Sequence, residues 1–542
     1  MSLPSLISAS SGSANRAVVV KQGRLLAASD SGHAVAVFRG VPYATPPVGD
    51  LRWRAPRPPS AWQGTRVAEK FGPAAEQYPV KQNSLFFGGA ENTSEDCLYL
   101  NIWTPARDGA EKLPVIVWLH LGGFAFGAGS VPNYDGTELA RAGAVVVTIN
   151  YRLGVLGFMA HPELTAESEH GSSGNYGLLD QIAALRWVRD NIAGFGGDRD
   201  NVTVTGLSAG SASVSMLMSS PLADGLFAKA IAMSAGLLGP VDESNDYGDG
   251  LQDLAAAERT GLQFARLAGA DGIAELRELP AQALLLLSAG LTDGPRWVMD
   301  SAGVEVPRGA FDGVYPIVDG WVVPESPYDL WAAGRESAVP LLTGSAADEK
   351  AGMPHLTSLT DWERYLLEYD DLAAELRAHF PVDDDVSSAD LSARTLADRI
   401  FIWQNWTMAR LHSRHAPTYY YHTSYAPPAP SSVAEVDPGA YHGCEIPYLF
   451  RHLDQKDWAW SAADYERSEV VSRYWLNFAR TGDPNGDGLP RWATFDVDSP
   501  RVQHFGATVG ESDVPRREVL DFWDRFFESR RRRAASEGAA QR

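Results

Sequence analysis

The chain has 542 residues, of which 45% are hydrophobic and 21% charged, and it is long enough to bury a large core. Its formal net charge of −22 argues against nucleic acid or an anionic membrane as a partner. No apolar run approaches the roughly 18 residues that a membrane-spanning helix needs, so we expect no span.

Apolar, β-rich runs alternate with helical patterns along the chain, which is typical of α/β proteins whose mostly parallel sheet has helices on both faces. The strands predicted, in chain order, are residues 115–119, 145–149, 202–205, 230–233, 341–343 and 419–424. The helices predicted are residues 178–191, 469–480 and 517–527. Two irregular stretches, 65–92 and 242–312, are insertions of the kind that often cap a pocket.

We expect a single domain over residues 16–528, with disordered ends at 1–15 and at the basic tail 529–542. Residues 1–15 contain no Lys or Arg and no long apolar run, so we expect no secretory signal and a cytoplasmic location. The two cysteines, Cys97 and Cys444, lie far apart and are interpreted as free thiols.

A candidate nucleophile, Ser208, lies in the pentapeptide Gly-Leu-Ser-Ala-Gly over residues 206–210. The β-branched run before it and the small residues after it predict a strand, a sharp turn and a helix. Such a turn exposes the serine hydroxyl, and the glycines remove Cβ atoms where the backbones meet. A helix-start serine between turn glycines is the competing interpretation.

A serine hydroxyl needs a base to activate it, and the base needs an acid to orient it. His442, in a turn after the last predicted strand, is the candidate base, although a structural loop histidine fits the pattern equally well. Asp348 and Glu349 both follow the strand at 341–343, in the Ser–acid–His order of α/β-hydrolases. The residue pattern alone does not choose between these two carboxylates.

If such a serine attacks the carbonyl group of an ester, the site also needs hydrogen-bond donors for the negatively charged oxygen of the tetrahedral intermediate. Gly122 and Gly123 follow the strand at 115–119, and the N–H of Ala209 would complete an oxyanion hole. A glycine turn that merely ends a strand is the alternative. Leu121, Phe124 and Leu207 flank these groups and are predicted to line the substrate site.

No cofactor and no metal are expected. His412 and His415 are spaced i, i+3 on a helical pattern and could indicate a metal site. No third ligand lies near them in the sequence, so surface histidines are the simpler interpretation.

Several blocks together resemble the type B carboxylesterase/lipase family, which includes bacterial para-nitrobenzyl esterases and animal cholinesterases. The matching blocks are residues 38–44, 46–49, 95–101, 174–181, 442–448 and 478–485. The resemblance extends from about Val37 to Asp524 and implies one α/β-hydrolase domain, with cap-like insertions around a mostly parallel sheet. It also implies a serine carboxylic-ester hydrolase that forms an acyl-enzyme, and it selects Glu349 as the acid.

The chain departs from the family pattern at four positions. Leu207 stands where the family usually has Glu, and Leu121 and Lys350 stand where it usually has Gly. Ala75 stands where eukaryotic members have the cysteine that pairs with Cys97, and the loss of that bridge fits a reducing compartment. Without a carboxylate at 207, we expect neutral or acid-bearing esters to be preferred over cationic, choline-like ones; a purely packing role for Leu207 is equally compatible.

Two alternatives remain open at this point. The same residues could hydrolyse carbamates or amides, and a non-catalytic adhesion or binding relative is less expected because the chain keeps all three catalytic residue types. The expected partners are a small ester and water, and the expected assembly is a monomer or a homodimer.

Overall fold

The computed structural model describes residues 16–28, 35–77, 85, 90, 92–241, 249–288, 297–299, 305–307, 314–350, 353, 355–430 and 438–540. The predicted N-terminal disorder at 1–15 lies outside these residues.

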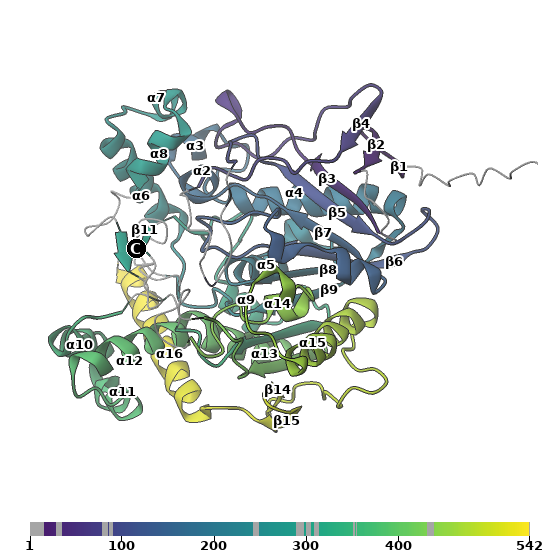
Figure 1. Ribbon diagram of the computed structural model, residues 1–542. Helices are drawn as coiled ribbons and strands as arrows, with labels where there is room; N and C mark the ends of the chain where they lie inside the picture. Colours follow the sequence, from purple (N-terminus) through teal and green to yellow (C-terminus); the bar gives the residue numbers. More distant parts are fainter. Residues whose placement is uncertain are drawn as a thin grey trace, which may run out of the picture.

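A ten-stranded sheet crosses the molecule in the order β15-β14-β13-β12-β9-β8-β6-β7-β5-β3 (Figure 1). Its strands are β3 (Ala36–Pro42), β5 (Tyr99–Thr104), β6 (Leu113–Leu119), β7 (Val145–Ile149), β8 (Gly197–Leu207), β9 (Lys229–Met233), β12 (Leu341–Ala346), β13 (Thr418–Thr423), β14 (Arg501–Phe505) and β15 (Val509–Asp513). The run from β7 through β14 is parallel, and both edges are antiparallel. All six predicted strands lie in this parallel core, which confirms the α/β fold class.

Strand β6 shows why these strands appear in the sequence as continuous apolar runs. Val115, Val117 and Leu119 belong to the core cluster on one face, with α4 (Tyr176–Asn191) and α5 (Ala209–Ser219). Ile116 and Trp118 belong to the cluster on the other face, with α1 (Thr137–Arg141) and α15 (Ala462–Thr481). Because the strand is buried on both faces, neither set of alternate positions can be polar.

The remaining elements surround this sheet. The other helices are α2 (Gly154–Phe158), α3 (Pro162–Glu167), α6 (Leu254–Ala268), α7 (Ile273–Glu278), α8 (Ala281–Ser288), α9 (Pro327–Ala332), α10 (Leu359–Tyr365), α11 (Ala373–His379), α12 (Asp385–Ala397), α13 (Trp403–His412), α14 (Ile446–Leu449) and α16 (Arg517–Ala540). Smaller sheets are formed by β1 (Ala17–Val20), β2 (Gly23–Ala27) and β4 (Thr65–Ala68), and by β10 (Trp297–Met299) and β11 (Glu305–Pro307). The predicted insertion at 242–312 contains α6, α7 and α8, which lie together at one end of the molecule (Figure 1).

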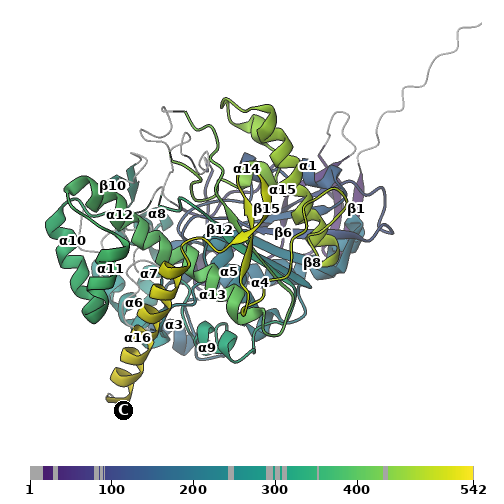
Figure 2. The ribbon, with the colours of Figure 1, turned by 90° about the horizontal axis from the view of Figure 1, so that it is seen from below.

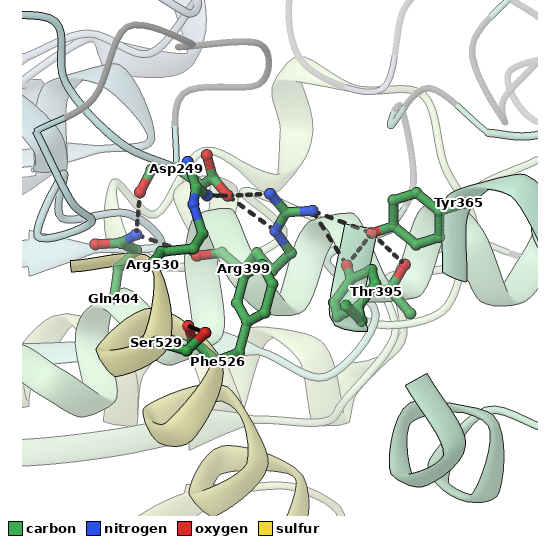
Figure 3. Close-up of polar contacts among 9 residues, drawn as sticks. Asp249, Tyr365, Thr395, Arg399, Gln404, Phe526, Ser529 and Arg530 are labelled. Atoms are coloured by element: carbon green, nitrogen blue, oxygen red, sulfur yellow. Dashed lines mark hydrogen bonds and ion pairs between the residues drawn. The ribbon is translucent and has the colours of Figure 1, made fainter. Parts of the chain in front are cut away.

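The C-terminal helix corrects one prediction. Residues 529–540, expected to be disordered, continue α16, which passes α13 and reaches the edge of the molecule (Figure 2). Arg530 pairs at 2.9 Å with the buried carboxylate of Asp249, which also accepts a 2.8 Å hydrogen bond from Arg399 Nε (Figure 3). Burial alone would raise the pKa of Asp249, but the charges of Arg399 and Arg530 outweigh it and lower the pKa. The basic tail was mispredicted because a buried carboxylate distant in sequence neutralises one of its arginines.

Both cysteines are buried and free, which confirms the prediction for Cys97 and Cys444. Among the helices of the described residues, none is both long and apolar enough to cross a membrane.

Candidate active site

Ser208 lies in the turn between β8 and α5, as predicted, and its backbone is strained. Its φ of 59° and ψ of −122° are unusual for a residue with a side chain. A Cβ atom at Gly206 would overlap the backbone of Gly210, and one at Gly210 would overlap the carbonyl oxygen of Leu119. The Ser208 N–H donates to the carbonyl of Met233 at 2.9 Å. The two glycines therefore permit a close approach of strand and helix that holds the serine at the sharp turn.

The predicted oxyanion loop has a shape that glycine permits. Gly122 and Gly123 have φ values of 127° and 56°, and the Gly122 carbonyl accepts N–H groups of Ala125 at 2.9 Å and Phe126 at 3.1 Å. Ala209 is the first residue of α5, where an N–H group has no acceptor within the helix and the helix dipole is positive. Both segments thus offer backbone of the kind that binds a negatively charged oxygen.

His120, to which the sequence assigned no role, holds this loop. Its fully buried ring donates from Nδ1 to the Leu121 carbonyl at 2.8 Å and stacks on Tyr151 with 4.4 Å between ring centroids. The Tyr151 hydroxyl donates to the His120 carbonyl at 3.0 Å. Burial lowers the pKa of His120 to about 4, so the ring is neutral at pH 7. His120 is a positioning residue for the loop that follows it.

His442 and Glu349 are in direct contact. His442 Nδ1 donates to Glu349 Oε2 at 2.5 Å, and Glu349 Oε1 accepts from Ser234 Oγ at 2.6 Å and Ala346 N at 2.7 Å. Glu349 is fully buried, and His442 is 5% exposed. The His442 ring stacks on Phe401, which comes from the π-helix Asp398–Ile402 between α12 and α13, with 4.1 Å between ring centroids. The imidazole is therefore fixed from its edge and from its face.

The rival carboxylate, Asp348, has a different task. Its Oδ2 accepts from Ala440 N at 3.0 Å, and its own N–H donates to the Ala440 carbonyl at 3.0 Å. Arg394 lies 3.6 Å from its other oxygen. Asp348 thus ties down the turn that carries His442, while Glu349 faces the imidazole, in agreement with the family resemblance.

The predicted segments meet at the end of the sheet where the parallel strands finish. A Cβ atom at Gly443, beside the histidine, would lie 3.5 Å from Leu207 Cδ2 and 3.9 Å from Leu121 Cδ2, so the histidine turn lies close to both the elbow and the predicted oxyanion loop. Ser234, which binds the acid, directly follows the strand residue that accepts the Ser208 N–H. The carboxyl ends of the parallel strands are where open α/β sheets place their ligand sites.

The three predicted substrate-binding side chains are buried. Leu207, Leu121 and Phe124 are 0%, 3% and 2% exposed. Phe124 packs edge-to-face on Phe158 and Tyr315, with centroid distances of 5.1 and 6.1 Å. These contacts place all three beside the oxyanion loop and elbow, and their role in substrate binding stays a prediction.

A second buried carboxylate, Glu445, was missed by the sequence analysis. It is 1% exposed and accepts a hydrogen bond from the Tyr421 hydroxyl at 3.1 Å. Burial and the nearby charge of Glu349 raise the pKa of Glu445 to about 8, so it is mostly protonated at pH 7. An acidic residue within the apolar histidine block, residues 442–448, was the signal that could have found it.

The interpretation of His412 and His415 as surface histidines is wrong for His412. That ring is fully buried, whereas His415 keeps 26% of its side chain exposed. Glu336, 76 residues earlier, contacts both rings. The i, i+3 spacing could not indicate burial. The C-terminal end of α13, which carries His412, packs against the chain before β12, and this contact is visible only in the folded structure.

Known proteins resemble this chain in sequence and in overall fold. A sequence profile described as the carboxylesterase family matches residues 15–523. The chain belongs to the carboxylesterase family. This carboxylesterase is 37% identical over 496 residues to a fumonisin B1 esterase of Sphingopyxis macrogoltabida, covering 88% of this chain and 85% of the relative. It is 33% identical over 539 residues to liver carboxylesterase 1 of Oryctolagus cuniculus, covering 93% and 91%.

A solved structure of a PNB esterase superposes with a TM-score of 0.79 at 30% identity, covering 94% of this chain and 99% of that one. These findings confirm the predicted family, the α/β-hydrolase fold and the enzymatic class. The carboxylesterase is a hydrolase of carboxylic esters, whose substrates are a small ester and water.

Proposed function

We propose that this carboxylesterase cleaves esters through an acyl-enzyme on Ser208, with His442 as base and Glu349 as acid. The Ser208 Oγ attacks the ester carbonyl while His442 Nε2 takes its proton. The histidine then gives this proton to the leaving alcohol, and a water molecule, activated in the same way, releases the carboxylic acid. The observation that carries the proposal is the 2.5 Å hydrogen bond from His442 Nδ1 to buried Glu349.

That hydrogen bond matters because it sets which ring nitrogen is basic. With the proton of a neutral ring held on Nδ1, the lone pair lies on Nε2, where a serine proton can be received. The N–H groups of Gly122, Gly123 and Ala209 then serve the oxyanion, each contributing roughly 3 kcal/mol when preorganised. The elbow and the buried His120 support this preorganisation, since hydrogen bonds to neighbouring backbone hold both of them in place.

Ser208→Ala tests the nucleophile. We expect hydrolysis of a p-nitrophenyl ester to be lost without a change in the melting temperature, and covalent labelling by an organophosphonate to disappear. Ser211→Ala is the matched control, because the Ser211 hydroxyl, one helical turn away, is already bonded to the Ala235 carbonyl at 2.6 Å. Labelling of a Ser208→Ala variant would contradict the assignment.

We further propose that the preferred substrates carry neutral or acid-bearing acyl groups. Two positions beside the triad bear no negative charge at neutral pH: Leu207 is apolar, and the raised pKa of Glu445 keeps that carboxyl protonated. A cationic alcohol therefore finds little attraction there, while an anionic acyl group meets little repulsion. The similarity to an esterase named for fumonisin B1 gives a first compound to assay.

Leu207→Glu and its uncharged counterpart Leu207→Gln test this charge argument. The ratio of kcat/KM for a choline ester to that for an isosteric neutral ester is expected to rise about 10-fold in the Glu variant at pH 9 relative to the Gln variant. Equal ratios in the two variants would mean that charge at 207 does not reach the substrate. Bursts with ester, carbamate and anilide substrates in the wild type would separate the ester activity from the carbamate or amide alternative.

We also propose a reducing, cytoplasmic setting, supported by two buried free thiols and by Ala75 in place of a pairing cysteine. A monomer or homodimer is expected, and light scattering coupled to gel filtration measures which one forms.

A further inference from the structure

Three potential metal ligands meet at the end of the sheet opposite the proposed active site. Glu336 lies between α9 and β12, His412 ends α13, and His415 lies in the turn before β13. Their ligand atoms all lie within 4.8 Å of one another, and no other such trio occurs among the residues that the structure describes. Because all three precede the parallel strands, they lie at the amino ends, whereas the proposed triad lies at the carboxyl ends.

The hydrogen bonds of His412 define which of its nitrogens faces the carboxylate. His412 Nε2 lies 2.8 Å from the Val339 carbonyl, which can only accept, so Nε2 carries the proton. A neutral ring then directs the lone pair of Nδ1 at Glu336 Oε1, 2.7 Å away. Two acceptors at this distance need a cation between them or a second proton on the ring. An N–H bonded to a backbone carbonyl is also the usual outer contact of a metal-bound histidine.

The carboxylate offers more acceptor capacity than its neighbours use. Glu336 Oε1 lies 2.7 Å from His412 Nδ1 and 2.5 Å from His415 Nε2, and the Glu336 side chain is fully buried. Its other oxygen, Oε2, is buried with no hydrogen-bond partner within the part of the chain that the structure describes. A buried carboxylate oxygen without a partner is costly, and coordination of a cation would satisfy it.

We propose that Glu336, His412 and His415 bind a zinc ion. Two imidazole nitrogens and a carboxylate oxygen suit Zn²⁺, with water as the fourth ligand of a tetrahedron. Bonds of about 2.0–2.1 Å require ligand atoms about 3.3 Å apart, so the present contacts must open by less than about 1 Å. The partly exposed side of His415 gives the ion and its water a route from solvent.

The zinc ion joins two segments that are 76 residues apart in sequence. It links the chain that enters β12 to the turn that enters β13, neighbouring strands whose far ends lead to Glu349 and to the histidine turn. Its role is to hold this end of the sheet together, and it takes no part in ester hydrolysis.

The test uses untagged full-length enzyme, freed of metal by a chelator and then titrated with Zn²⁺. Equilibrium dialysis with elemental analysis should find one tightly bound equivalent in the wild type. His415→Gln, a change at the surface, should weaken this binding about 100-fold or more. His379→Gln is the matched control, since His379 lies 3.6 Å from Glu375 on α11, a carboxylate that already pairs with Arg525, and is not part of the trio.

Two further readouts guard against a merely structural effect. Co²⁺ should give the visible absorption of a four-coordinate complex in the wild type, and Glu336→Gln should change or abolish that spectrum. Zn²⁺ should raise the melting temperature of the wild type and of His379→Gln but not of His415→Gln, with ester hydrolysis unchanged. Absence of a bound equivalent, as expected for an imidazolium–carboxylate pair alone, or binding that His415→Gln leaves intact, would overturn the proposal.

Discussion

Glu349→Gln is expected to lower kcat about 10⁴-fold while leaving the fold intact. The structure fixes how the new side chain must lie. The Oε1 position accepts hydrogen bonds from Ser234 Oγ and Ala346 N, so the amide oxygen of the glutamine must stay there. Its NH₂ group then faces His442 Nδ1, where the wild type has an acceptor at 2.5 Å.

Two donors cannot face each other, so the histidine must move its proton to Nε2. That nitrogen then has no lone pair with which to receive the Ser208 proton, and general-base catalysis is lost. A triad with the wrong tautomer loses about 10⁴-fold in kcat, or about 5 kcal/mol of transition-state stabilisation, while the oxyanion hole remains. Because the loss comes from the tautomer, raising the pH should not restore it.

Steady-state hydrolysis of a p-nitrophenyl ester measures the effect, and circular dichroism with thermal unfolding verifies the fold. Asp348→Asn is the matched control, because an asparagine oxygen can still accept the Ala440 N–H; we expect its kcat to stay within about threefold of the wild type. If Glu349→Gln kept more than a tenth of wild-type kcat, or if Asp348→Asn lost as much as Glu349→Gln, the reasoning would be refuted.

Three further changes probe the supporting structure. Gly210→Ala puts a methyl group onto the Leu119 carbonyl oxygen; a displacement of about 1 Å should lower kcat about 100-fold, and unchanged kinetics would contradict the close-approach argument. Glu445 has a folded-state pKa of about 8 against about 4.3 when unfolded, so the folded state holds an extra proton between these values and stability falls as pH rises through that window. Glu445→Gln should remove this loss, at most about 1.4 kcal/mol per pH unit, in urea unfolding between pH 5 and 8, and parallel curves would disprove it. Arg530→Gln should lower the free energy of unfolding by about 1–3 kcal/mol; the loss is limited because the buried carboxylate of Asp249 keeps Arg399 as a partner. Arg532 is exposed, so Arg532→Gln should change the free energy of unfolding by less than about 0.5 kcal/mol, as is usual for surface positions. Equal effects of the two changes would show that α16 is not anchored at Asp249.

Local signals in the sequence were sufficient for six strands of the parallel core and for the elbow. Strands such as β6 appear as unbroken apolar runs because both faces are buried, and the glycines at 206 and 210 mark where a strand and a helix must touch. The order of serine, acid and histidine, together with the matching blocks, was sufficient to indicate the family, which the comparisons confirm.

Tertiary packing determined the features that depend on partners distant in the chain. Asp348 and Glu349 are adjacent in sequence after β12, yet the folded chain brings Ala440 to one and His442 to the other. The protonation of Glu445 likewise follows from burial near a second carboxylate. Burial and the distance between charged groups are properties of the folded structure, so no pattern within a short segment can encode them.

The sequence by itself therefore determined which residue types are present and which local turns they can form, since propensity and periodicity act over a few residues. The tertiary structure alone decided which polar groups meet, as in the contacts of Glu336 with two histidines and of Arg530 with Asp249. The physical reason is that hydrogen bonds and ion pairs act over a few ångströms in space, whereas these partners are separated by 76 or more residues in the chain.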